Sequence, residues 1–116
     1  MYILLNYLAY LVDNLISYYE EEVKNSNCSC RFIRLGHVGI LSISFAFQSG
    51  RNTFVAMKIS EIPLWFRTIK SNGTSFCAVS QDGGNQVLEC IFSNDIGITI
   101  WGTAVSASGQ LIILCE

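Results

Sequence analysis

The sequence predicts a mainly β protein, in which an antiparallel, jelly-roll-like β-sandwich head follows one N-terminal α-helix. Three observations lead to this fold class. Residues 1–25 carry apolar side chains at helical spacing, without any Gly or Pro. From Cys30 onward, the hydrophobic pattern changes to a period of two, which is typical of strands. Turns rich in glycine then separate about eight short strands spaced roughly 8–12 residues apart, as in all-β sandwiches.

The first element expected is a helix over residues 1–25. Its apolar stripe follows the 3.5-residue period of a coiled-coil seam. Apolar residues such as Leu5 and Val12 widen this stripe, and a wider stripe favours more than two helices in a bundle. Such a helix either docks on its own domain or pairs with copies of itself. The expected contact residues of an oligomerisation stalk are Leu4, Leu8, Leu11, Leu15 and Tyr18.

The chain therefore divides into a stalk at residues 1–25, a hinge at 26–30 and a head domain at 31–116. Residues 104–109, which are small and polar, are expected to form a loop, as is the segment around Pro63. The expected strands are Arg31–Leu35, His37–Phe47, Thr53–Ile59, Thr74–Gln81, Gln86–Phe92, Ile98–Gly102 and Gln110–Cys115.

The strongest local signal for a hairpin is Asp82-Gly83-Gly84-Asn85, because paired glycines suit a two-residue turn. This turn would pair Val79 with Leu88 and Cys77 with Cys90. The two cysteines would then lie close enough for a disulfide, although a pair of buried thiols fits a reducing cytosol better. Residues expected in the core are Phe45, Val79, Leu88, Ile98, Ile100 and Ile112.

Composition indicates the kinds of partner. Hydrophobic residues make up 51% of the chain and charged residues 14%, which favours a subunit of an oligomer. The net charge is −2 with no basic patch, which argues against nucleic acid. Asn6, Asp13 and Asn14 interrupt the first apolar run, so no membrane partner is expected.

Catalysis and cofactors are not expected. His37 is the only histidine, and the acidic residues form no obvious pair for acid–base chemistry. Cys28 and Cys30 are too few for a closed metal site, so neither metal nor cofactor is predicted. Trp65 and Trp101 are the candidate ligand-binding residues, because tryptophan rings stack on sugars; the alternative for both is a place in the core.

Three short motifs give a resemblance to a known family. They are residues 62–67 (Ile-Pro-Leu-Trp-Phe-Arg), residues 94–101 (Asn-Asp-Ile-Gly-Ile-Thr-Ile-Trp) and the glycine-led last strand at 108–114. In this order they resemble the C-terminal heads of bacteriophage tail-fibre and baseplate receptor-binding proteins. The chain departs from that pattern at Ile96, and Thr68 stands where a second proline is usual.

The resemblance implies a non-enzymatic homotrimer of the virion tail, assembled in the bacterial cytoplasm. Its implied partners are other tail or baseplate proteins and, as host receptor, a bacterial cell-surface polysaccharide. Two alternatives stay open: a trimeric jelly-roll signalling ligand of the cytokine or complement-head type, and a small lectin domain. The first basic residue is Lys24, so a secretory signal is not apparent, which counts against the signalling ligand.

Overall fold

The described part of the chain is built almost entirely of antiparallel strands. A computed structural model describes residues 18–51, 53–69, 73–80, 87–102 and 104–116. Within these residues, eight strands and one short 3₁₀ turn, Ile59–Glu61, are present. The predicted mainly β, antiparallel character of the head is therefore confirmed.

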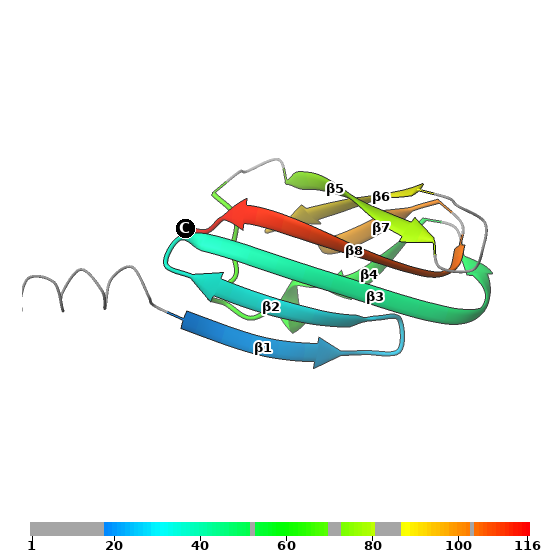
Figure 1. The fold of residues 1–116 in the computed structure, drawn as a ribbon, viewed down its shortest axis with the longest axis horizontal. Coiled ribbons are helices and arrows are strands. Elements are labelled where there is room, and N and C mark those ends of the chain that lie inside the picture. Colours follow the sequence, from blue (N-terminus) through cyan, green and yellow to red (C-terminus); the bar gives the residue numbers. More distant parts are fainter. Residues whose placement is uncertain (1–17, 52, 70–72, 81–86, 103) are drawn as a thin grey trace, which may run out of the picture.

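The strands form one continuous sheet with the order β1-β2-β3-β8-β5-β6-β7-β4, where two separate sheets were expected. The sheet curls into a half-barrel, so that its two halves enclose the core (Figure 1). One half consists of β1, β2, β3 and β8, and the other of β5, β6, β7 and β4. Among the described residues, three residue pairs join β8 to β5. The strands are β1 (Tyr18–Lys24), β2 (Ser29–Leu35), β3 (Val38–Arg51), β4 (Phe54–Lys58), β5 (Thr74–Ser80), β6 (Val87–Ser93), β7 (Gly97–Trp101) and β8 (Ala104–Leu114).

Strand β1 occupies the end of the segment that was predicted to form the helical stalk. The helix expected to run to residue 25 is wrong for Tyr18–Lys24, which pair antiparallel with Ser29–Leu35 of β2. The rest of the predicted helix lies outside the described residues. Residues 18–24 form a strand instead of a helix because alternate side chains then contact the rest of the domain. Tyr19 stacks on Trp65 at 5.4 Å between ring centroids, and Val23 packs against the core.

The predicted hinge at residues 26–30 contains the turn of the β1–β2 hairpin and the start of β2. Asn25 organises this turn: its side-chain Oδ1 accepts hydrogen bonds from the backbone N–H groups of Asn27 (2.7 Å) and Cys28 (2.9 Å). An Asn that bonds to the backbone two and three residues ahead is a common turn former. Strand β1 thus belongs to the same sheet as the head.

Two other predictions are wrong, one about which residues form a strand and one about strand register. Residues 104–109 were expected to form a loop, but they belong to β8 and pair with β3 and β5. In the β5–β6 hairpin, Val79 pairs with Val87, not with Leu88. A shift of one residue turns every side chain to the opposite face of a sheet.

This register separates Cys77 from Cys90. Cys77 pairs with Glu89 on the exposed face, whereas Cys90 pairs with Phe76 on the buried face, so the predicted cross-strand contact between the cysteines is wrong. Burial raises the pKa of the Cys90 thiol to about 11. Cys90 is therefore a protonated, apolar component of the core at neutral pH.

Of the residues predicted in the core, Phe45, Leu88, Ile98 and Ile100 are buried, but Val79 and Ile112 are exposed. The inward positions of β5 and β8 are the alternate residues, such as Ala78 and Ile113. The largest side chains that are almost fully buried are Phe32, Phe66, Phe92, Leu41, Ile43, Met57, Ile98 and Ile100.

The segment around Pro63 forms a loop, as predicted, and its aromatic residues pack on the core. Phe66 is fully buried, and Trp65 packs against the core while staying partly exposed. Two arginines hold this loop through its carbonyl groups: Arg34 donates to the Trp65 carbonyl at 2.7 Å, and Arg67 donates to the Pro63 carbonyl at 2.8 Å. Hydrogen bonds from charged donors are stronger than neutral ones, so the loop is well anchored.

Candidate functional site

The outer face of β1, β2, β3 and β8 carries two rows of apolar side chains. These strands lie side by side in Figure 1. In the first row, register places Tyr18 beside Leu35, Leu35 beside Val38, and Val38 beside Leu114. The second row, two residues along each strand, joins Ile33, Ile40 and Ile112. We call these seven residues the apolar rows.

Five of the seven side chains in the apolar rows are exposed, and Ile33 and Ile40 are half-buried. Ile112 is 70% exposed and Leu114 is 57% exposed. Leu35, Val38 and Tyr18 are exposed as well, so the patch extends over four strands. A contiguous exposed apolar patch marks an interaction surface more often than isolated surface hydrophobics do.

A row of polar side chains crosses the same outer face further along the strands. Register joins Arg31, Ser42 and Gln110 on β2, β3 and β8. On the other half of the sheet it joins Cys77, Glu89 and Trp101 on β5, β6 and β7. Gln110 and Cys77 line one hollow of about 560 Å³, which connects the two halves of the row. We call these six residues the polar row.

The polar row is long and follows the curved outer surface of the sheet. Its path crosses six strands, which corresponds to about 24 Å along the surface at roughly 4.8 Å between neighbouring strands. A second hollow of about 370 Å³ includes both Cys77 and Glu89, on β5 and β6. The row offers a guanidinium and an amide as donors, a carboxylate as acceptor, and one exposed aromatic ring.

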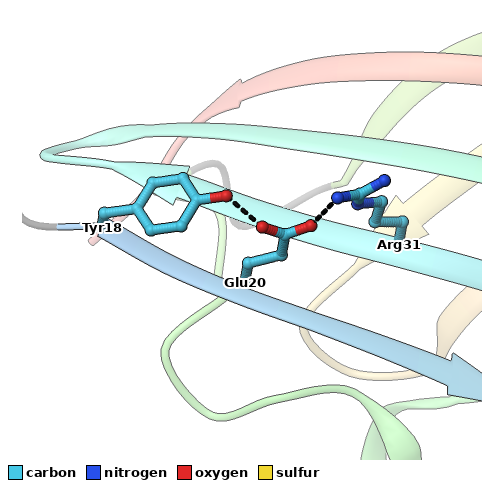
Figure 2. Close-up of polar contacts among 3 residues, drawn as sticks. All are labelled: Tyr18, Glu20 and Arg31. Atoms are coloured by element: carbon cyan, nitrogen blue, oxygen red, sulfur yellow. Dashed lines mark hydrogen bonds and ion pairs between the residues drawn. The ribbon is translucent and has the colours of Figure 1, made fainter.

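Three side chains form a polar contact at the boundary between the two regions (Figure 2). Glu20 accepts a hydrogen bond from the hydroxyl of Tyr18 and an ion-pair contact from the guanidinium of Arg31. Because Arg31 is largely exposed, this ion pair adds little to stability. It positions Tyr18 at the end of an apolar row and Arg31 at the end of the polar row.

The two candidate ligand-binding tryptophans do not share a site. Trp65 lies in the loop that closes the core, and Tyr19 stacks on one face of its ring. Trp101 is 48% exposed and lies opposite Glu89, at the far end of the polar row. A planar ring beside a carboxylate suits a sugar, whose faces are apolar and whose edges carry hydroxyl groups. Only Trp101 therefore has the surroundings expected of a sugar-binding residue.

The structure bears differently on the predicted stalk contacts, on metal sites and on membrane-spanning helices. Leu4, Leu8, Leu11 and Leu15 lie outside the described residues, and Tyr18 lies in the apolar rows on β1. Among the residues that the structure describes, no group of three His, Cys, Asp or Glu side chains is placed to hold a metal ion. In that same part of the chain, no helix has the length and apolar character needed to cross a bilayer.

Neither row was recognised from the sequence, although one signal was available. Residues 111–114 are a continuous apolar run, and such runs are typical of strands covered on both faces. No sequence pattern indicated the polar row, because its residues come from six strands whose order in the sheet differs from their order in the chain. Comparison with protein-family models and with curated proteins finds no match to this chain.

Proposed function

We propose that this chain is a non-enzymatic, homotrimeric module of a bacteriophage tail fibre or baseplate that binds a cell-surface polysaccharide of the bacterial host. The observation that carries the proposal is the division of the outer sheet face into apolar rows and a polar row. The resemblance of residues 62–67, 94–101 and 108–114 to tail-fibre heads supports the same conclusion. Such a jelly-roll-like head would act in the virion tail after assembly in the bacterial cytoplasm.

The apolar rows are proposed as the contact between copies of this chain. Residues 1–17 lead directly into Tyr18, the first residue of one row. A stalk formed through Leu4, Leu8, Leu11 and Leu15 of three copies would hold these rows close together. A small patch then suffices, because the stalk supplies a high local concentration.

The polar row is proposed as the polysaccharide site. Arg31, Gln110 and Glu89 provide hydrogen-bonding groups along its length, and Trp101 provides a ring on which a sugar can stack. An extended row suits a repeating polymer better than a small ligand, because successive units make similar contacts. The polar row continues beyond the strands of the apolar rows onto β5, β6 and β7, so its end at Glu89 and Trp101 stays accessible in the proposed assembly.

The assembly is tested by light scattering on the full chain. We expect wild type to have three times the mass of one chain. The double substitution Leu8→Asp and Leu15→Asp should reduce this to the mass of a single chain, while circular dichroism of the sheet stays unchanged. Each buried leucine contributes about 1.5–3 kcal/mol to the stability of the helix bundle. The variant loses this contribution at two positions in three copies and would also have to bury charged groups there, which prevents assembly.

The contribution of the apolar rows is tested separately. Ile112→Lys with Leu114→Lys should raise the concentration at which trimers dissociate by about tenfold or more. This is equivalent to about 2.7 kcal/mol per trimer, because that concentration varies as the square root of the trimer dissociation constant. The matched control is Ser44→Lys with Gln110→Lys, which adds the same charges to the same outer face outside the apolar rows. A wild-type monomer, or equal dissociation of both variants, would contradict the proposed contact.

Polysaccharide binding is tested with glycans purified from bacterial cell surfaces. We expect Trp101→Ala to weaken binding by at least about tenfold, or about 1.4 kcal/mol. Trp65→Phe is the matched control, because it changes the other tryptophan while keeping an aromatic ring against Tyr19. Equal losses for both variants, or wild-type protein that retains no glycan from any host, would rule out the polar row as a receptor site.

A further inference from the structure

Two thiols lie together beneath the turn between β1 and β2. The Sγ atoms of Cys28 and Cys30 are 3.8 Å apart, and both residues are buried. Cys28 lies in the turn and Cys30 lies in β2 with its side chain in the core. Cys28, which is 6% exposed, also lines a surface recess of about 390 Å³.

The same turn connects the two edges of the sheet. Strands β1 and β4 are the first and last in the sheet order, yet the turn after β1 contacts Ala56 of β4. The Ala56 carbonyl accepts hydrogen bonds from Asn25 Nδ2 at 2.9 Å, from Asn27 Nδ2 at 3.4 Å and from Cys28 Sγ at 3.4 Å. We call these contacts the edge latch. Cys28 is thus both a member of the thiol pair and a donor in the latch.

The two thiols differ in acidity. The hydrogen bond between them lowers the pKa of Cys28, whose sulfur accepts it, and raises the pKa of Cys30 well above its ordinary value. Burial raises the pKa of Cys30 further. Cys28 therefore ionises first, and thiolates rather than thiols react with peroxides. Cys30 keeps its proton and lies within reach to react with an oxidised neighbour.

We propose that Cys28 and Cys30 form a redox site that closes to a disulfide when a small peroxide oxidises Cys28. The Cys28 thiolate attacks one peroxide oxygen and breaks the O–O bond, which gives a sulfenic acid and, after protonation, one water. The Cys30 sulfur then attacks the Cys28 sulfur, and the S–OH oxygen leaves with the Cys30 proton as a second water. Both sulfurs are oxidised and one hydrogen peroxide is reduced.

Closure of the disulfide has a structural consequence. The oxidised Cys28 sulfur has no hydrogen to donate, so the edge latch loses its contact from sulfur to the Ala56 carbonyl. The contacts from Asn25 and Asn27 are independent of oxidation. We therefore expect oxidation to weaken the edge latch without breaking it. Amide hydrogens of β4 should then exchange faster in the oxidised protein. This inference does not depend on the proposed function.

The test uses the full chain with Cys77→Ser, which removes the exposed thiol and prevents disulfides between copies. The native protein is treated with hydrogen peroxide, denatured, alkylated with iodoacetamide and digested with trypsin. Cleavage after Lys24 and Arg31 places both cysteines in one peptide, residues 25–31. We expect this peptide to escape alkylation and to be lighter by two hydrogen atoms, while Cys90 is alkylated.

A second variant separates the two chemical steps. With Cys30→Ser, oxidation should stop at the sulfenic acid of Cys28, which dimedone traps as a covalent adduct. Two outcomes would overturn the proposal. One is a peptide 25–31 that is doubly alkylated after peroxide treatment. The other is a disulfide that joins Cys28 or Cys30 to Cys90 or Cys115. Peptide mapping of the Cys77→Ser protein shows whether Cys28 and Cys30 form a disulfide even if the Cys30→Ser variant fails to fold.

Discussion

Replacing Phe66 by alanine is expected to lower the free energy of unfolding by about 3–5 kcal/mol. Phe66 is fully buried between the two halves of the curled sheet. Its ring makes edge contacts with Phe32 of β2 at 5.0 Å and with Phe92 of β6 at 5.4 Å between centroids. Alanine would leave a cavity between these strands, because strands of a closed core cannot move together to fill it.

This loss is large compared with the roughly 5–15 kcal/mol by which domains of ordinary size are stable. The measurement is urea unfolding followed by circular dichroism, with all variants at one protein concentration because association also stabilises the folded state. Leu64→Ala is the matched control: Leu64 lies two residues away in the same loop and is 86% exposed. We expect its change to stay within about 0.5 kcal/mol. Similar unfolding curves for the two variants would contradict the position of Phe66 between the halves.

The sequence predicted most strands of the head because alternation and turn residues act locally. The strand expected at His37–Phe47 alternates large and small residues, and Phe45, which was predicted in the core, is buried there together with Leu41 and Ile43. Gly36 has a positive φ of 59° between β2 and β3, at the break between the expected strands Arg31–Leu35 and His37–Phe47. Both features depend on a few neighbouring residues, so no knowledge of the rest of the fold is required.

The errors arose where one pattern fits two structures. Tyr19 and Val23 are four residues apart, which places them on one face of a helix, but residues 19, 21 and 23 also share one face of a strand. Pairing with β2 decides in favour of the strand. In β8, the side chains of Ser106, Ala107 and Ser108 alternate between the two faces of the sheet. Because they are small, this stretch of sequence resembles a loop. Ala107 is fully buried opposite Ser80, where β8 pairs with β5.

The candidate site was less predictable than the fold because it depends on strand order. Strand β8 lies between β3 and β5, so Gln110 is brought beside residues that are far away in the sequence. Trp101 was singled out by residue type alone, and its neighbour Glu89 became apparent only from the register of β6 and β7. The edge latch likewise joins Cys28 to Ala56 through the curl of the sheet, which no local pattern encodes.

Gly97→Ala is expected to destabilise the protein by about 2–5 kcal/mol through backbone strain and a steric clash. Gly97 begins β7 with a φ of 113°, a conformation that residues with a side chain rarely adopt. A Cβ atom at this position would lie 2.2 Å from the carbonyl oxygen of Met57 and 2.8 Å from the backbone nitrogen of Ile59. These are backbone atoms at the end of β4, so no side-chain rotation relieves the clash.

The expected consequence is local as well as global. The backbone of Ile59 donates to the carbonyl of Ile96 at 2.9 Å, and Gly97 pairs with Lys58, so a displaced backbone at Gly97 disrupts the β4–β7 ladder first. Urea unfolding measures the total loss, and hydrogen exchange should show β4 losing protection before β6. Gly36→Asn is the control, because asparagine adopts a φ near 59° at little cost. An alanine at Gly97 that left both measurements unchanged would show that β4 does not pack against the start of β7.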